Sequence, residues 1–139
     1  MRGLTGEKLR RFPVRLRGIL LGRPADLILH PSAPRLLGLD VLCGDGTHRF
    51  LSSAAATVRE EEIEVGSPFV LLDLPSESLY RTRACPLSKL IGTPVGDDGA
   101  VLRDVVLGPG WTIDELVLED GRGERRVPFG GTLVPEHAP

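Results

Sequence analysis

Cys43 and His48 are the side chains of the first half whose types and spacing could support nucleophilic catalysis. They flank the glycine-containing turn 44–46, and a tight hairpin at this turn would bring them near each other. A catalytic thiol needs a base within hydrogen-bond reach, usually with a third group that orients the base. However, Cys43 follows the alternation of Leu39 and Val41, which places its side chain on the core side of the strand. We therefore predict a buried free thiol and no enzymatic activity.

Metal and phosphate chemistry have no signature in the sequence either. The three histidines, His30, His48 and His137, are dispersed, and neither a CxxC nor an HxxxH spacing occurs. The glycines of 92–96 are not followed by the Gly-Lys-Ser/Thr of a phosphate loop, and Ser88 lacks the glycine frame of a nucleophile elbow. We therefore predict no metal site and no bound cofactor.

Basic side chains gather near the N-terminus, where residues 1–17 contain six basic residues and one acid. They could contact phosphate or an acidic protein, or they could be the solvated face of a strand. The net charge of −2 gives no global attraction for nucleic acid. An aromatic content of 4% also leaves few platforms on which single-stranded RNA could stack. The candidate contacts in this segment are Arg10, Arg11, Arg15 and Arg17.

Trp111 is the only tryptophan of the chain and directly follows the Gly-Pro-Gly sequence 108–110. If this turn exposes the indole ring, Trp111 would be a natural anchor for a partner protein, because tryptophan is enriched at binding hot spots. The alternative is that the ring folds back over the second half of the chain. The sequence leaves both interpretations open.

The composition is that of a soluble globular protein. The chain has 139 residues, of which 41% are hydrophobic and 26% charged, and it suits one ordinary domain or two small ones. Nothing approaches the roughly 18 apolar residues of a membrane span. The apolar run 19–21 is also far shorter than a signal-peptide core. Two cysteines are too few for a disulfide framework. We expect a cytoplasmic protein without a transmembrane segment.

Short apolar segments between glycine- and proline-rich turns predict a chain made mostly of β-strands. The segment 52–62 has helical propensity but almost no apolar stripe, so we predict one short turn near 54–56 and then extended chain. Glutamates 60–62 are interpreted as a solvated turn, with a divalent-cation site as the alternative. The predicted strands are 10–21, 26–29, 36–43, 47–51, 63–65, 69–74 (buried), 79–85, 101–107, 113–119 and 125–129, with one helical turn within 87–92.

One pattern occurs twice. An aspartate, three aliphatic residues and, one residue further on, a proline appear within 25–31 and again within 103–109. Each copy precedes a second aliphatic run that ends in a Gly-x-Gly turn, which predicts a duplicated β unit. We assign the two aspartates a structural role, since such carboxylates bind turn N–H groups. The offset is 78 between Asp26 and Asp104 and 77 further on, where Gly44 aligns with Gly121, Gly46 with Gly123, Arg49 with Arg126 and Phe50 with Val127.

These segments resemble the PRC-barrel family, named for the photosynthetic reaction centre. The resemblance rests on the aspartate-led strand, the Gly-x-Gly turn and the continuation through 50–58 and 63–65, and it covers roughly 17–65 and again 87–134. It implies a small all-β barrel with strongly curved strands. Members occur in the cytoplasmic face of the reaction-centre H subunit and in a ribosome maturation factor. Their shared trait is docking onto another protein, and the family has no common catalytic residues.

We therefore expect an all-β fold with two small PRC-barrel-like barrels related by internal duplication. The predicted organisation is a flexible tail 1–9, a first unit 10–76, a second unit 77–135 and a C-terminal tail 136–139. Units of this size bury little surface alone. We expect them to pack together like the subunits of a homodimer, with 69–74 and the aspartate-led strands at their interface.

The leading functional hypothesis is a non-catalytic adapter that binds an unknown protein partner. The alternative is an RNA- or ribosome-associated maturation factor that binds through the N-terminal arginines. A small enzyme is the third hypothesis. Self-association into a homodimer stays open, as does the identity of the partner.

Overall fold

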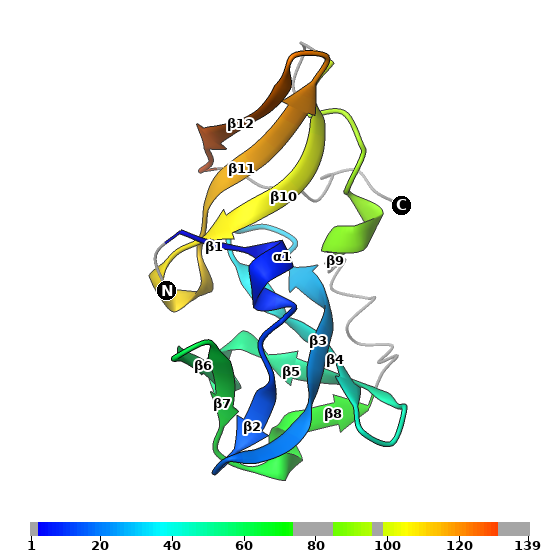
Figure 1. Cartoon of the computed structure of the whole chain (residues 1–139), viewed down its shortest axis with the longest axis vertical. Coiled ribbons are helices and arrows are strands. Elements are labelled where there is room, and N and C mark those ends of the chain that lie inside the picture. The colour runs from blue at the N-terminus through cyan, green and yellow to red at the C-terminus, as the bar shows by residue number, and fades with distance from the viewer. Residues whose placement is uncertain (1–2, 74–84, 96–98, 131–139) are drawn as a thin grey trace.

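The computed structural model describes residues 3–73, 85–95 and 99–130 of the chain. These residues form two curled β-sheets that follow one another along the long axis of the molecule (Figure 1). The all-β fold with two barrel-like units, which the sequence predicts, is confirmed.

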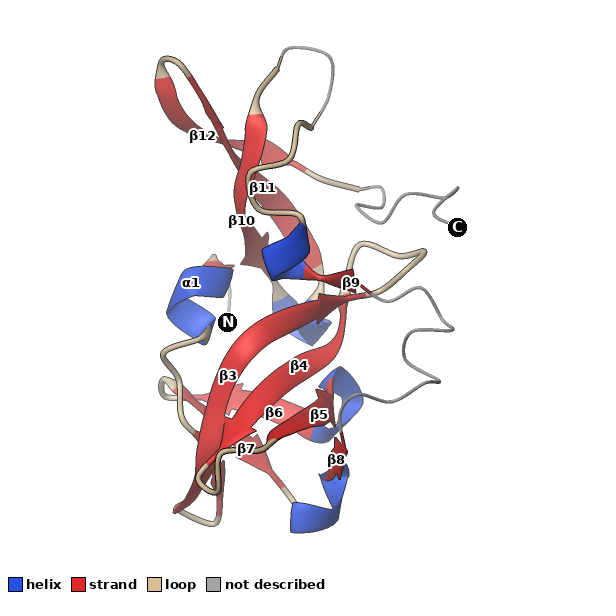
Figure 2. Ribbon diagram, turned by 90° about the vertical axis from the view of Figure 1, so that its right-hand side faces the viewer, coloured by secondary structure: helices blue, strands red, loops and turns tan. Residues whose placement is uncertain are grey.

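The larger sheet has eight strands, most of them from the first half of the chain. They are β2 (Val14–Leu16), β3 (Ile19–Leu29), β4 (Leu36–Cys43), β5 (His48–Ser52), β6 (Ala56–Arg59), β7 (Glu62–Val65), β8 (Leu71–Asp73) and β9 (Cys85–Pro86). Their order is β6-β7-β2-β3-β4-β5-β8, and β9 pairs with β3 outside this path. The long pair β3–β4 curves from the lower end of the molecule toward β9 (Figure 2).

The smaller sheet belongs mainly to the second half. Its strands are β1 (Leu4–Thr5), β10 (Val101–Leu107), β11 (Ile113–Asp120) and β12 (Gly123–Pro128), in the order β1-β10-β11-β12. The helical elements are short: α1 (Gly6–Leu9) and the 3-10 helices η1 (Ser53–Ala55), η2 (Pro68–Val70), η3 (Leu87–Lys89) and η4 (Pro109–Trp111).

The hairpins β3–β4 and β10–β11 have the same register. Asp26 pairs with Asp40 in the first, and Asp104 pairs with Val117 in the second. A bulge follows Pro24 in the first hairpin and Leu102 in the second, each two residues before its aspartate. The offsets of 78 and 77 found in the sequence therefore also describe the strand pairing.

After the second strand of each hairpin, the offset between the two copies falls from 77 to 76 residues. Val41 pairs with Arg49, and the equivalent Leu118 pairs with Arg125. The sequence alignment of Arg49 with Arg126 is therefore wrong by one position. The reason is that the β11–β12 connection is one residue shorter than the β4–β5 connection, which a comparison of glycine positions alone does not reveal.

Residues 4–9 do not form the flexible tail that the sequence predicted. Leu4 and Thr5 form β1, which pairs with β10 of the second half, and α1 follows directly. Leu4 is buried, and Leu9 is 0% exposed. Thr5 caps α1 by accepting a hydrogen bond from the backbone N–H of Lys8. Residues 4–9 therefore belong to the fold.

The two halves exchange short edge strands. At the start of the chain β1 joins the sheet of the second half, and at the start of the second half β9 joins the sheet of the first. Leu29 pairs with Cys85, and Leu107, which is 78 residues after Leu29, pairs with Leu4. A boundary at residue 76 or 77 thus divides the sequence but not the sheets.

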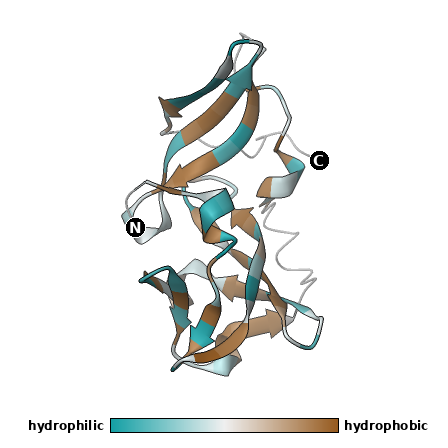
Figure 3. Ribbon diagram, in the orientation of Figure 1, coloured by the Kyte–Doolittle hydropathy of each residue, from teal (hydrophilic) through white to brown (hydrophobic). Residues whose placement is uncertain are grey.

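One hydrophobic core passes through both halves. Leu27, Leu39 and Val41 of the larger sheet and Val105 and Leu107 of the smaller sheet belong to a single cluster of buried side chains. The alternation of apolar and polar residues along these strands is visible as brown and teal bands in Figure 3. Sharing one core relieves the shortage of buried surface that each unit would have alone.

Two local predictions on either side of β6 and β7 had different outcomes. The short turn expected near 54–56 is η1, and the extended segment after it is β6, so this prediction is confirmed. The expectation of a buried strand at 69–74 is wrong: 69–70 lie in η2 with Phe69 88% exposed, and in the strand that follows, β8, Leu72 is 53% exposed. Phe69 is therefore absent from the interface between the halves.

Several other expectations fall outside the described residues. These are the boundary between the units at 76–77, most of the strand 79–85, and the C-terminal residues from 131, which include His137 and the tail 136–139.

Candidate functional site

The four candidate arginines lie in two separate places. Arg10 and Arg11 follow α1 near the junction of the halves, and Arg11 pairs with Glu7 at 2.9 Å. Arg15 lies in β2, where it pairs with Glu62 at 3.3 Å, and Arg17 lies in the exposed β2–β3 turn at the lower end of the molecule. The fold therefore does not assemble them into one acid-free basic patch.

Trp111 is buried rather than presented as an exposed anchor. Its side chain is 6% exposed, and its indole Nε1–H donates a hydrogen bond of 3.1 Å to the backbone carbonyl of Ala56 in β6. The ring thus folds back, as the second interpretation had it, but it reaches the larger sheet of the first half. Trp111 consequently joins the two halves and is unavailable to a partner in this structure.

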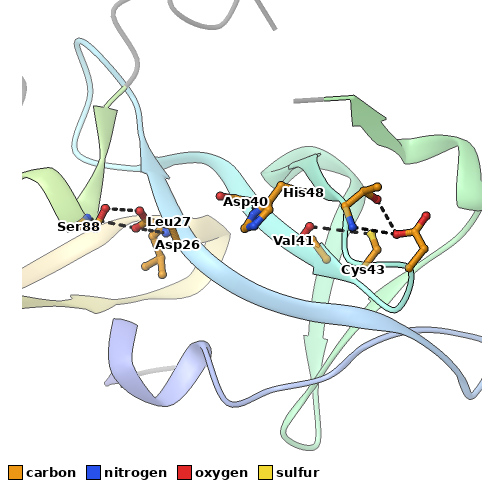
Figure 4. Close-up of polar contacts among 9 residues, drawn as sticks. Asp26, Leu27, Asp40, Val41, Cys43, His48 and Ser88 are labelled. Carbon is orange, nitrogen blue, oxygen red and sulfur yellow. Dashed lines mark hydrogen bonds and ion pairs between the residues drawn. The ribbon is translucent and has the colours of Figure 1, made fainter. Parts of the chain in front are cut away.

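Asp26, near the end of β3, connects this strand to the 3-10 helix η3 of the other half. One carboxylate oxygen accepts from the backbone N–H of Leu27 at 2.9 Å and from that of Ser88 at 3.1 Å. The other oxygen accepts from the Ser88 hydroxyl (Figure 4). The carboxylate therefore satisfies a backbone donor at the start of η3, which has no other side-chain cap.

Asp104 makes the matching connection in the opposite direction. It accepts from the backbone N–H of Val105 at 2.8 Å and from that of Glu7 in α1 at 3.0 Å. The approach is close, since a Cβ on Gly6 would lie 2.5 Å from the Asp104 carboxylate. Each repeated aspartate thus binds its own strand and the helix of the other half, which gives the structural role expected from the repeat a specific form.

Replacing either aspartate is expected to destabilise the protein without removing any apolar contact. Asp26→Ala and Asp104→Ala each leave backbone N–H groups without their acceptor, which costs about 1–3 kcal/mol of unfolding free energy. Urea unfolding measures this loss. Glu124→Ala is the matched control, because Glu124 is an exposed carboxylate beside the same cleft. An equal loss in the control would show a general charge effect and contradict the capping role.

A cleft of about 740 Å³ lies beside these two aspartates, between the halves. Its charged lining is mixed: Glu7, Asp26, Asp104 and Glu124 face Arg10, Arg103, Arg125 and Arg126. Two of these arginines are paired with acids, Arg103 with Glu119 and Arg125 with Asp120. The cleft therefore shows no preference for a ligand of either charge.

Cys43 and His48 are directed to different partners. The Cys43 thiol points to the carbonyl of Val41 at 3.9 Å, while the His48 Nδ1 lies 2.8 Å from a carboxylate oxygen of Asp40 (Figure 4). Burial raises the pKa of the Cys43 thiol, and the nearby Arg49 guanidinium only partly opposes this rise. The thiolate that a nucleophile requires is therefore disfavoured near neutral pH.

Metal-binding and membrane-spanning features were also sought in the structure. Within 3–73, 85–95 and 99–130, no three histidine, cysteine or acidic side chains are grouped so that they could hold a metal ion. In the same ranges, no helix has the length and apolar character needed to cross a membrane.

The feature that the sequence did not predict is a set of large apolar side chains exposed on the first unit. We call Ile19, Leu20 and Phe69, at one end of this unit, the exposed apolar face. Ile19 and Leu20 begin β3 and are 64% and 52% exposed, and Phe69 lies in η2. The start of β3 and the helix η2 lie at the lower end of the molecule in Figures 1 and 2. Leu42 and Leu72 are exposed too, but they point to the other side of the sheet, because their strand neighbours Cys43 and Leu71 line the cleft described next.

The exposed apolar face borders a shallow cleft of about 330 Å³ at the open end of the first barrel. Leu20 and Leu21 line one part of it, and Pro68 and Leu71 line another. Arg49 contributes a cation to this lining. Large apolar side chains around a concave surface are typical of a site that receives a side chain of another molecule.

A signal for this face exists in the sequence. Ile19, Leu20 and Leu21 are consecutive apolar residues, and in a strand neighbouring side chains point to opposite faces. They cannot all enter the core, so at least one must be exposed or covered by another element.

The chain matches no family model, no curated protein and no solved structure. The PRC-barrel resemblance therefore remains a prediction carried by the residues quoted for it.

Proposed function

We propose that this protein is a non-catalytic adapter that docks onto another protein through the exposed apolar face of its first unit. The observation that carries the proposal is the exposure of three large apolar side chains at one end of the first unit, Ile19, Leu20 and Phe69, with Phe69 almost fully in water. Burying one such side chain at an interface contributes roughly 1.5–3 kcal/mol. A few side chains of this kind are enough to supply the hot spot of a specific complex.

The second unit supports this proposal by comparison. Glu119 of β11 occupies the position that Leu42 has in β4. Leu42 pairs with Arg23, and Glu119 pairs with Val101. These two pairs are related by the same offsets of 77 and 78 residues as the rest of the repeat. Phe50 of β5 likewise corresponds to Arg126 of β12. The hairpin thus accepts charged residues at these positions. The first unit therefore carries apolar residues at two positions where the second unit carries charged ones.

The PRC-barrel resemblance agrees with this proposal, since docking onto other proteins is the shared trait of that family. It also motivates the proposal that the protein works in the cytoplasm. RNA association remains the alternative, but the candidate arginines 11 and 15 are engaged by Glu7 and Glu62, which weakens their attraction for phosphate.

The test compares complexes formed in native lysate by the tagged full chain and by two variants. Leu20→Ser/Phe69→Ser removes two side chains of the exposed apolar face. The protein complex is expected to lose at least tenfold in affinity, because two hot-spot side chains exceed about 1.4 kcal/mol together. It is expected to survive nuclease and high salt.

Arg122→Ala is the control for this experiment, since Arg122 is exposed in the β11–β12 turn of the other unit. It should bind like the parent protein. A complex that nuclease dissolves would replace the proposal with the RNA alternative. A complex that both variants retain would show that the exposed apolar face is not the docking site.

A further inference from the structure

We infer that this chain forms a dimer with a second copy of itself by exchanging residues 4–9, which we call the N-terminal arm. The arm consists of β1 and α1, and it docks on β10 of the second unit. In the dimer, the arm of each chain docks on β10 of the other chain. The inference is independent of the proposed function, because it does not involve the exposed apolar face.

The arm has a counterpart at the start of the second unit. Residues 4–14 match residues 85–95 at an offset of 81, with identical residues at positions 8, 9, 13 and 14. Leu4 pairs with Leu107, and its counterpart Cys85 pairs with Leu29. Each unit therefore gives its first segment to the other unit, which is the arrangement of a dimer whose subunits exchange an identical element.

The groups that hold the arm are present in every copy of the chain. Leu4 and Thr5 pair with β10, and the Asp104 carboxylate accepts from the backbone N–H of Glu7 at 3.0 Å. A second copy offers the same strand edge and the same carboxylate. Because the arm makes the same contacts in either form, the dimer loses none of them and forms at the cost of association alone.

The hinge for this exchange is formed by Arg10 and Arg11. The residues after it are fixed in the first unit, since Phe12 is buried and the carbonyl of Pro13 accepts from a backbone N–H of β7 at 2.8 Å. Arg10 has helical backbone angles (φ −65°, ψ −14°), and Arg11 donates to the carbonyl of Lys8 at 3.0 Å. Opening this last turn directs the arm away from its own chain and leaves β2 paired.

Gly6 favours docking of the arm on the second unit of the other copy. Gly6 and Leu87 are counterparts at the offset of 81, and they meet between the halves. A Cβ on Gly6 would lie 3.4 Å from a methyl carbon of Leu87 and 2.5 Å from the Asp104 carboxylate. Two first units would set glycine against glycine and lose this packing. The arm is therefore expected on β10 of the second copy, and reciprocal exchange closes a two-fold dimer.

The first test is a concentration series of the full chain, warmed gently to let the arms exchange and then measured by size-exclusion chromatography with light scattering. The balance depends on the effective concentration of the arm within its own chain, which is on the order of millimolar for a short linker. The parent protein should be monomeric at micromolar concentration and partly dimeric at millimolar concentration.

Arg11→Pro should lower the dissociation constant of the dimer at least tenfold. The substitution removes the N–H that closes the last turn and disfavours the helical conformation of Arg10, so it extends the hinge. Arg11→Ala is the matched control and should behave like the parent, because it leaves the hinge able to bend. Circular dichroism shows whether each variant is folded.

A short bismaleimide cross-link identifies the exchanged segment. In Thr5→Cys/Val106→Cys, the new thiols lie on paired residues of β1 and β10, and Cys43→Ser/Cys85→Ser removes the native thiols. The cross-link should lie within one chain in the monomer and join two chains in the dimer.

The inference is overturned if the parent and Arg11→Pro both remain monomeric over the concentration series. It is also overturned if the cross-links of a dimer stay within single chains. Leu20→Ser/Phe69→Ser should leave the dimer unchanged, and a loss of the dimer in this variant would show that copies associate through the exposed apolar face instead. The lysate complex tests the proposed function separately, so either result can fail without the other.

Discussion

Deletion of residues 1–9 is expected to leave the protein unfolded or barely stable. The deletion removes the buried side chains of Leu4 and Leu9, the β1–β10 pairing and one of the two aspartate-capped helices. Truncating a single buried leucine to alanine already costs about 2–5 kcal/mol. A domain has only about 5–15 kcal/mol of stability in total. Urea unfolding followed by the fluorescence of Trp111 measures the effect.

Lys8→Ala is the control for this deletion. Lys8 is exposed in the same segment and its only ion pair, with Glu61, is 3.9 Å long within the described residues. Changing it should shift the unfolding free energy by no more than about 0.5 kcal/mol. A deletion variant as stable as the full chain would restore the interpretation of residues 1–9 as a tail.

Trp111→Ala is expected to reduce the unfolding free energy by about 3–5 kcal/mol, the usual cost of removing a buried tryptophan. The loss is large because the indole ring packs into the core shared by both halves and its N–H binds the carbonyl of Ala56. Circular dichroism during urea unfolding follows the variant, which lacks the only tryptophan. In the parent protein, the fluorescence should be typical of an indole shielded from water.

Trp111→Phe separates packing from the hydrogen bond. It retains most of the aromatic volume and leaves the carbonyl of Ala56 without its donor, so its loss should be clearly smaller than that of Trp111→Ala. If Trp111→Ala instead preserves stability and abolishes the lysate complex, the indole is an exposed partner anchor and its buried position is incorrect.

Interactions between near neighbours in the chain could be predicted from the sequence. The turn at 44–46 closes through Asp45, which binds the backbone N–H of Thr47 two residues later. The turn at 53–55 is capped by Ser52 in the same way. The aspartate repeat also predicted equal strand pairing, because similar local sequences form similar hairpins.

The N-terminal segment could not be predicted in this way. A strand of two residues and a helix of four are too short to show a period of 2 or 3.6 in their apolar residues. Their stability comes from β10 and Asp104, almost one hundred residues away. No local pattern records such a contact.

The candidate docking face was missed for a related reason. The amino-acid sequence of an apolar run such as 69–72 does not indicate whether its side chains enter a core or face water. Phe69 is exposed because η2 lies at the open end of the barrel. For Trp111 the opposite error was possible. Its position after a glycine- and proline-rich turn suggested an exposed ring, but the ring is buried because it packs against the first half.

The sequence by itself determined the β class, the hairpins and the repeated aspartates, since these depend on neighbouring residues and on alternation along a strand. Only the tertiary structure decided which edge strands are exchanged, which half each aspartate binds and which apolar side chains face water. Those outcomes depend on surfaces that meet only after the two halves have packed together.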